Sequence, residues 1–93
     1  MKESEIEYYL VRQVQKMGGY ALKLAPTVAG LPDRLVLLPD GGIMFAELKS
    51  DDGEARPLQL VWQRRLRELG FVSEILNSKE SVRRFLETGR SDG

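Results

Sequence analysis

The sequence contains neither cysteine nor histidine. Without cysteine it forms no disulfide bonds and no thiolate metal sites, which fits a reducing cytoplasm. Without histidine, histidine-dependent catalytic triads and zinc sites of the usual kind are excluded. Any chemistry of this chain must therefore come from carboxylates, lysine, arginine, tyrosine or serine.

Long apolar runs are also missing. No stretch of about 18 consecutive apolar residues occurs, so the sequence predicts no membrane span. Neither charge prevails, because 14 basic residues balance 14 acidic ones and give no overall attraction to nucleic acid. Residues 54–93 nevertheless carry 8 Lys and Arg against 6 Asp and Glu. If some acidic side chains bind metal ions, the remaining surface is positive, so composition alone leaves the partner open.

The 93 residues, of which 42% are hydrophobic, are enough for one small domain, expected over residues 1–89 with a disordered tail over 90–93. Apolar periodicity and turn residues predict an α/β domain in the order α-β-β-β-α-β-α. The expected elements are a helix over 3–17, strands over 20–24, 34–38 and 43–48, a helix over 57–69, a strand over 71–76 and a helix over 79–88. The apolar face that the second helix should bury consists of Leu58, Val61, Trp62, Leu66 and Leu69.

The chain between the second and third strands has turn chemistry that selects one loop length. In LPDGG, residues 38–42, Pro39 suits the first loop position of a type I turn, Asp40 the second, and Gly41 a left-handed third position. A three-residue loop makes Leu38 face Gly42 and fixes every later pair of the hairpin. Asp40, at the tip of this loop, is expected to be a turn residue only.

The same register places Asp33 opposite Glu47, and Lys49 follows two residues later on the same face. Charged groups are costly beside buried strands unless they are paired. Two carboxylates on one face repel each other, which predicts a cation between them, and oxygen ligands alone favour Mg²⁺ or Mn²⁺. The alternative is a strand-end salt bridge between Lys49 and either carboxylate.

The sequence resembles the PD-(D/E)xK nuclease signature and, over nearly all of its length, stand-alone nucleases of the VRR-NUC family. The motifs that carry the resemblance are an acid in the first helix, Gly18-Gly19, Lys23, GLPDR at 30–34, ELK at 47–49, PLQ at 57–59, Trp62 and LRELG at 66–70. The resemblance implies a restriction-endonuclease-like fold. That fold has an α-β-β-β-α-β core, a C-terminal helix and a mixed sheet flanked by helices.

Transferred to this sequence, the resemblance implies that Asp33, Glu47 and the backbone carbonyl of Leu48 bind the metal. Lys49 would orient or deprotonate the attacking water, or neutralise charge on the phosphate. These four residues form the implied catalytic centre.

A helix acid and a glutamine complete the implied site. Glu7 is preferred as the acid, because Glu3 lies at the helix start, where an acidic side chain interacts favourably with the helix dipole. Glu3, one turn away, stays the alternative. Gln59, at the start of the second helix, is expected to hydrogen-bond Lys49 or a phosphate, with an exposed helix glutamine as the alternative.

Basic residues are candidates for contacts with the DNA backbone, because Lys and Arg neutralise phosphates. The candidates are Lys23, Arg34, Arg56, Arg64, Arg65 and Arg67. Lys23 is equally consistent with a solvated strand end, and exposed helix arginines commonly serve only solubility. Trp62 is expected in the core, with base stacking as the alternative.

The implied function is a metal-dependent, structure-selective DNA endonuclease that works as a homodimer in the cytoplasm of a bacterium or a phage-infected cell. The paired sites of a dimer would suit symmetric cuts in a four-way (Holliday) junction, as in DNA repair. Two alternatives stay open. One is a non-catalytic nucleic-acid-binding module of the same fold, which the intact Asp33, Glu47 and Lys49 disfavour. The other is a protein-interaction domain, which the zero net charge favours.

Overall fold

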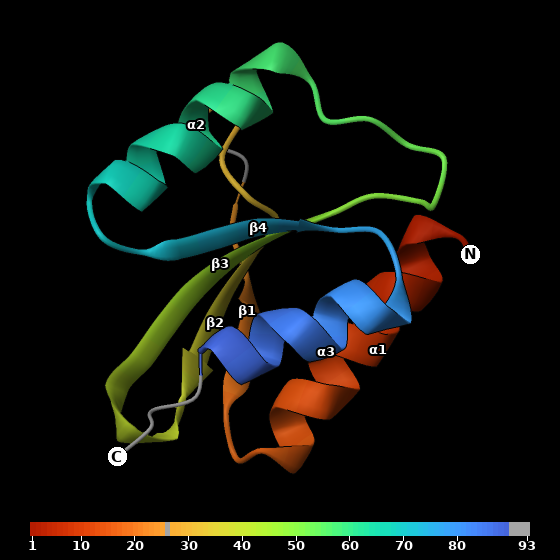
Figure 1. Cartoon of the computed structure of the whole chain (residues 1–93), viewed down its shortest axis with the longest axis vertical. Helices are drawn as coiled ribbons and strands as arrows, with labels where there is room; N and C mark the ends of the chain where they lie inside the picture. Colours follow the sequence, from red (N-terminus) through yellow and green to blue (C-terminus); the bar gives the residue numbers. More distant parts are fainter. Residues whose placement is uncertain (26, 90–93) are drawn as a thin grey trace.

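The computed structural model describes residues 1–25 and 27–89. Within these residues it has three α-helices and four strands (Figure 1), which are α1 (Glu3–Lys16), β1 (Tyr20–Lys23), β2 (Arg34–Leu38), β3 (Gly42–Leu48), α2 (Pro57–Glu68), β4 (Val72–Leu76) and α3 (Lys79–Thr88). This order confirms the predicted core and C-terminal helix. The disorder expected of residues 90–93 lies outside the described residues. No helix in the described part of the chain is both long and apolar enough to cross a membrane.

The four strands form one mixed sheet in the order β1-β2-β3-β4. β1 pairs with β2 and β2 with β3 in antiparallel fashion, whereas β3 and β4 are parallel and joined through α2. In the hairpin Leu38 faces Gly42 and Leu35 faces Phe45, which confirms the register expected from a three-residue loop.

The conformation of the hairpin loop differs in one respect from the expected type I turn. Asp40 has φ 68° and Gly41 has φ 85°, so both residues, and not the glycine alone, are left-handed. Aspartate tolerates this region better than most residues, because its short side chain can hydrogen-bond locally. The register is unaffected, since it depends on the number of loop residues and not on their φ values.

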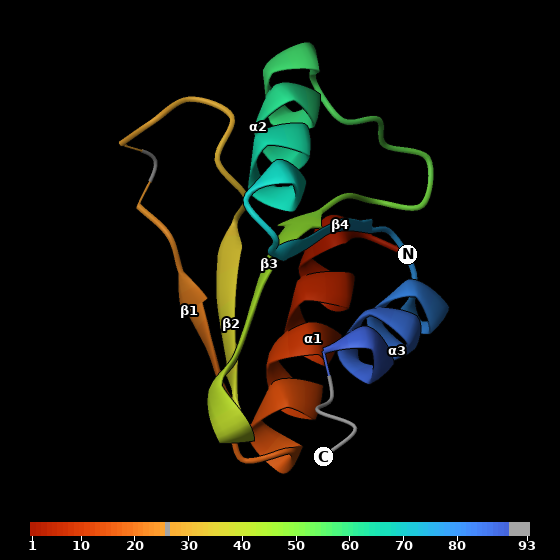
Figure 2. The same cartoon turned by 60° about the vertical axis from the view of Figure 1, so that its left-hand side comes forward.

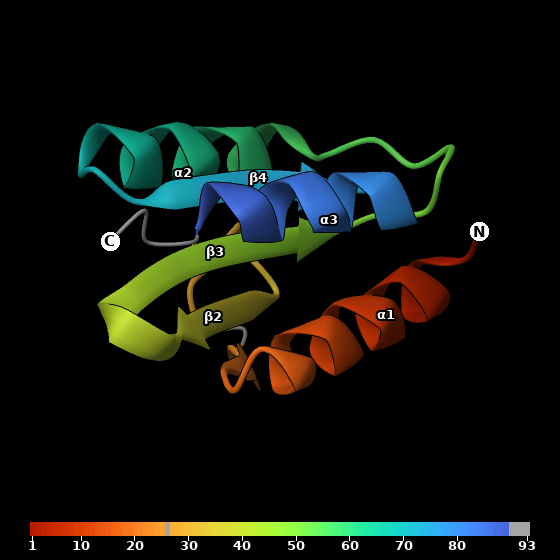
Figure 3. The ribbon, with the colours of Figure 1, turned by 60° about the horizontal axis from the view of Figure 1, so that its bottom comes forward.

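The helices lie on both sides of the sheet. α1 and α3 lie together on one side and α2 on the other (Figures 1 and 2). Figure 3 shows α2 running beside β4. Alternate strand residues point to opposite faces, so Val36, Met44, Ala46 and Leu48 point to the α1 and α3 side. They form one buried cluster with Ile6, Leu10, Val14, Leu38, Leu76, Val82, Phe85 and Leu86. This cluster is the hydrophobic core of the domain.

The other face of the sheet is thinly covered, and the apolar face expected for α2 is wrong in extent. Within α2 only Leu66 is buried. Leu58 at one end is 45% exposed, and Leu69 just beyond the other end is 72% exposed. The spacing of the apolar residues correctly indicates which side of α2 is apolar. The spacing does not say how much of that side the sheet or a loop covers. Tyr20 and Leu22 of β1 are left exposed on the same face of the sheet.

The loop that leads from β1 to β2 is held against the first turn of α2. Figure 2 shows this loop rising beside α2 before it enters β2. Gly30 has φ +90°, and a Cβ atom there would lie 2.7 Å from the carbonyl oxygen of Leu58. The amide of Leu24 closes the loop by donating to the carbonyl of Asp33 at 2.9 Å. The close approach of Gly30 to Leu58 therefore fixes where Asp33 begins the hairpin.

We expect Gly30→Ala to lower the free energy of unfolding by about 2–3 kcal/mol, because the new methyl group meets α2 in addition to the strain of a positive φ. Gly70→Ala is the matched control. Gly70 has φ +96°, but a Cβ atom there meets nothing within 4 Å among the described residues. It should therefore cost only about 1 kcal/mol. Urea unfolding of both variants checks this, and equal losses would show that the contact with α2 is unimportant.

Candidate active site

The carboxylate of Asp33 is fixed at the open end of the hairpin. Asp33 immediately precedes β2, and its Oδ2 accepts a hydrogen bond of 2.9 Å from the amide of Leu48, the last residue of β3. The Asp33 side chain thus takes the place of a backbone carbonyl as the acceptor for the last amide of β3. As the register predicts, the contact brings the Asp33 carboxylate next to that of Glu47.

Glu47 is buried, with 6% of its surface exposed. Its Oε2 accepts a hydrogen bond of 2.7 Å from Nε2 of Gln59 and lies 3.7 Å from Nζ of Lys49. Its Oε1 is buried too and has no hydrogen-bond partner among residues 1–25 and 27–89. An unpartnered carboxylate oxygen in such a position is costly, so the site is built to receive a further group there.

Gln59 is held in place by the helix that carries it. Its Oε1 accepts a hydrogen bond of 2.8 Å from the amide of Arg56, the residue that precedes α2. Since Oε1 must face that donor, Nε2 is directed at Glu47, and one amide orientation satisfies both contacts. This double role was not predicted from the sequence. The third helical position of Gln59, after Pro57, is the capping-box signal that could have indicated it.

Comparisons with known proteins identify the family of this chain. No model of a protein family matches the chain. "Putative nuclease p44" of Acyrthosiphon pisum secondary endosymbiont phage 1 is 42% identical over 81 residues, covering 86% of this chain and 87% of that protein. Among solved structures, a VRR_NUC domain superposes with a TM-score of 0.82 at 29% identity, over 94% of this chain and 97% of the other. The chain belongs to the VRR-NUC family of nucleases.

Glu47 of this VRR-NUC domain has a raised pKa. Burial, followed by the negative charge of Asp33, raises the pKa of Glu47 from 4.5 to about 7, against the opposing effect of Lys49. The nearby Asp33 carboxyl group and the charge of Glu3 act in the same direction as burial. Near neutral pH the pair therefore either holds a proton or requires a cation.

The two acids of the first helix have different surroundings. Oε2 of Glu7 lies 2.9 Å from Nε of Arg34, in an ion pair whose two side chains are 25% and 18% exposed. Glu3 is the acid whose charge acts on Glu47. The ion pair with Arg34 disfavours Glu7 as the acid of the site, and Glu3 is the one of the two whose charge acts on Glu47, but the choice between them stays a prediction.

Arg34 has a structural role that the sequence did not indicate. Besides its ion pair with Glu7, it donates a hydrogen bond of 2.9 Å from Nη1 to the carbonyl of Ala21 in β1. Its guanidinium thus joins α1 to the edge of the sheet. Lys23 pairs opposite Arg34 in the sheet and is exposed, so of these two residues Lys23 is the one free to reach a phosphate.

Among the described residues, the arginines of α2 form no ion pair with Asp33 or Glu47. The guanidinium of Arg65 stacks on the ring of Trp62 at 5.0 Å, and Trp62 is half-buried instead of lying in the main core. Arg64 pairs with Glu68 of its own helix. Arg67 pairs with Glu74 at 2.9 Å. Arg56, which immediately precedes α2, is exposed. Of the arginines in or beside α2 it is the nearest in sequence to Gln59. Phosphate contacts by these arginines stay predictions.

The donors at the site suit a hard divalent cation. Within the described residues no three acidic side chains form a metal-binding cluster. The site therefore offers two carboxylates, Asp33 and Glu47, with the Leu48 carbonyl as the further ligand implied by the sequence. Mg²⁺ commonly binds through one or two carboxylates and keeps waters and substrate phosphates as its other ligands. The unpartnered Oε1 of Glu47 fits this ligand set.

We expect Glu47→Gln to stabilise the metal-free protein above pH 7. The ordinary glutamate pKa is 4.5 and that of Glu47 is about 7, so between these values the unfolded chain loses a proton that the folded chain keeps. The free energy of unfolding of the wild type therefore falls as pH rises through this window. Glutamine does not ionise and avoids this loss of about 3 kcal/mol at most.

Urea unfolding in EDTA at pH 4.5 and pH 8 measures this difference. The gain from Glu47→Gln should be small at pH 4.5 and largest at pH 8. Glu54→Gln is the control, because Glu54 lies exposed in the segment before α2 and the same substitution there should change little. A Glu47→Gln variant less stable than the wild type at pH 8 would contradict the assigned electrostatics.

Proposed function

We propose that this VRR-NUC nuclease is an endonuclease that hydrolyses phosphodiester bonds of DNA with Mg²⁺ or Mn²⁺ as cofactor. The observation that carries the proposal is the buried Glu47 beside Asp33, with one carboxylate oxygen unpartnered among the described residues and the pKa raised. The ammonium of Lys49 lies 3.7 Å from Oε2, which Gln59 also contacts, so this salt bridge leaves Oε1 without a partner among the described residues. A divalent cation and a DNA phosphate supply what the arrangement requires.

The reaction consumes one water. The water oxygen forms a bond to phosphorus while the bond from phosphorus to one sugar oxygen breaks, which gives a phosphate monoester and a free hydroxyl. When bound, a divalent cation supplies positive charge beside the phosphate and lowers the pKa of a water in its coordination sphere.

The side chains of the domain have separate roles in this reaction. Asp33, held by the Leu48 amide, and Glu47, held by Gln59, provide the fixed oxygen ligands. The Lys49 ammonium, whose side chain is 15% exposed, adds positive charge where the phosphate becomes more negative. Glu3, in the first turn of α1, adds a further negative charge that acts on Glu47. Gln59 acts through Glu47 and is a positioning residue.

The nuclease proposal is tested by cleavage of labelled DNA in Mg²⁺ and Mn²⁺. Asp33→Asn and Lys49→Ala should each lower the cleavage rate at least about 100-fold, as losses of transition-state stabilisation commonly do. Asp40→Asn is the matched control. Asp40 also follows a proline, but it lies at the far end of the hairpin and in a left-handed conformation that asparagine adopts readily. Its rate should equal that of the wild type.

Cleavage that persists in Lys49→Ala and in EDTA would overturn the proposal. DNA binding without cleavage under any of these conditions would instead indicate a non-catalytic nucleic-acid-binding module.

We further propose that two copies pair through the uncovered face of the sheet. The row Tyr20, Leu37 and Ile43 crosses three strands and carries no charge. Its two outer members are 68% and 44% exposed. An apolar patch on one chain can meet the same patch of a second copy across a two-fold axis. Leu22, 46% exposed, lies on the same face. A dimer would present two sites to a branched DNA such as a four-way junction.

Light scattering after size-exclusion chromatography tests the pairing. The wild type should elute as a dimer and Leu22→Glu as a monomer, because a charge on the patch opposes its burial. Paired, symmetric cuts in a four-way junction should be lost in Leu22→Glu, while single cuts in duplex or flap DNA persist. A dimer that survives Leu22→Glu would place the interface elsewhere, and equal cleavage of junction, flap and duplex would remove the junction preference.

A further inference from the structure

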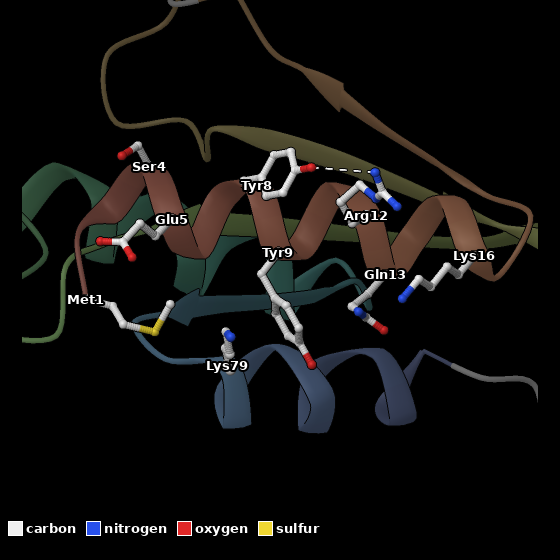
Figure 4. Close-up of a pocket in the computed structure, with 9 residues that line it drawn as sticks. All are labelled: Met1, Ser4, Glu5, Tyr8, Tyr9, Arg12, Gln13, Lys16 and Lys79. Atoms are coloured by element: carbon white, nitrogen blue, oxygen red, sulfur yellow. Dashed lines mark hydrogen bonds between the residues drawn. The ribbon is translucent and has the colours of Figure 1, made fainter.

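A groove on the outer side of α1 lies apart from the carboxylate pair. It has a volume of about 600 Å³ and runs along α1 beside the start of α3 (Figure 4). The residues that matter for its chemistry are Glu5, Tyr8, Tyr9, Arg12, Lys16 and Lys79. We name it the α1–α3 groove. None of these residues contributes to the nuclease site.

The two tyrosines of the groove are held by neighbouring cations. The guanidinium of Arg12 lies 6.0 Å from the centre of the Tyr8 ring, and its Nη1 donates to the Tyr8 hydroxyl at 3.5 Å. Nζ of Lys79 lies 5.3 Å from the centre of the Tyr9 ring, and Arg83 donates to the Tyr9 hydroxyl at 3.3 Å. Tyr8 is nevertheless 64% exposed, so a large aromatic surface with a fixed orientation faces solvent.

The charge of the groove is positive. Arg12, Lys16 and Lys79 line it, and none of the three forms an ion pair with another residue in 1–25 and 27–89. The acid of the groove, Glu5, accepts a hydrogen bond of 3.1 Å from the backbone amide of Lys2 at the start of the helix. The groove therefore attracts an anion, although the whole chain has no net charge.

The groove starts next to the nuclease site. At its N-terminal end, the amino group of Met1 lies 2.6 Å from Oδ2 of Asp51, two residues after Lys49. Glu3, which acts on Glu47, lies in the same first turn of α1. From there the helix runs for 14 residues, about 20 Å, with Lys16 at the far end. A strand that lies in the groove can thus continue into the site.

We propose that the α1–α3 groove binds an unpaired strand of the DNA substrate. A single strand carries a negative charge on every nucleotide and also an aromatic face, and the groove offers both cations and tyrosine rings. Bases stack on the exposed Tyr8, while Arg12, Lys16 and Lys79 contact phosphates. The inference rests on the proposed function, because the groove would bind a single-stranded part of the DNA substrate whose continuation reaches Asp33 and Glu47.

The test is fluorescence anisotropy of a labelled 12-nucleotide single-stranded DNA in EDTA, where hydrolysis does not interfere. Tyr8→Ala should weaken binding about 5- to 100-fold, the range seen when one stacked base loses its aromatic partner. The double variant Arg12→Glu/Lys16→Glu should weaken it at least as much and lower the slope of log affinity against log salt by about 1.4, at about 0.7 for each phosphate that is no longer neutralised. Both substitutions are on the exposed side of α1, so circular dichroism should show native melting.

Arg84→Glu is the matched control for charge. Arg84 lies on α3, is 72% exposed, pairs with Glu80 and does not line the groove. The affinity of the Arg84→Glu variant for single-stranded DNA should change far less than the affinity of the groove variants. Arg84→Glu reverses one charge and Arg12→Glu/Lys16→Glu reverses two, so an effect of Arg84→Glu that reaches half that of the double variant would show only nonspecific attraction and overturn the proposal. So would unchanged binding by Tyr8→Ala, or binding of an acidic peptide in preference to DNA.

The failure of this inference is distinguishable from failure of the nuclease proposal. If wild-type protein cleaves DNA and Asp33→Asn does not, but the groove variants bind single strands as the wild type does, the nuclease stands and the groove assignment falls. If the wild type cleaves nothing, yet binds single strands through Tyr8 and Arg12, the groove stands and the nuclease assignment falls.

Discussion

The hydrogen bond from the Leu48 amide to the Asp33 carboxylate is the contact on which the site depends. It joins the entrance of the hairpin to its exit, so both carboxylates are placed by one element instead of by separate loops. Two other features support it. The three-residue turn sets which residues face each other, and the approach of Gly30 to α2 sets where the loop delivers Asp33. Sites on such rigid elements hold their geometry well.

Stability and function oppose each other at Glu47. Burying a carboxylate beside another carboxylate lowers the stability of the metal-free domain near neutral pH, and the hydrogen bond from Gln59 holds it there nonetheless. The packed core on the α1 and α3 side offsets this cost. On the side of the sheet that α2 covers, few side chains are buried. This face therefore carries both the site and the exposed apolar row on which pairing of two copies would rest.

The sequence predicts most of this arrangement where one local rule decides the outcome. The element order and the hairpin register follow from periodicity and loop length, and the meeting of Asp33 with Glu47 follows from the register. The choice between Glu3 and Glu7 does not, because it depends on how α1 rotates against the sheet and on Arg34 reaching Glu7. The exposure of Leu58 and Leu69 was likewise beyond the sequence, since an amphipathic stripe does not identify what covers it. The second role of Gln59 was accessible from its capping position.

Titration with Mn²⁺ at pH 8 measures whether Asp33 and Glu47 together bind a divalent cation, as proposed above. Free Mn²⁺ is counted by electron paramagnetic resonance with wild-type protein, Asp33→Asn and Glu47→Gln. We expect the wild type to bind Mn²⁺ and each variant, while still folded, to bind it at least about tenfold more weakly, because each has lost a charged ligand. Wild-type affinity in Glu47→Gln would contradict this proposal.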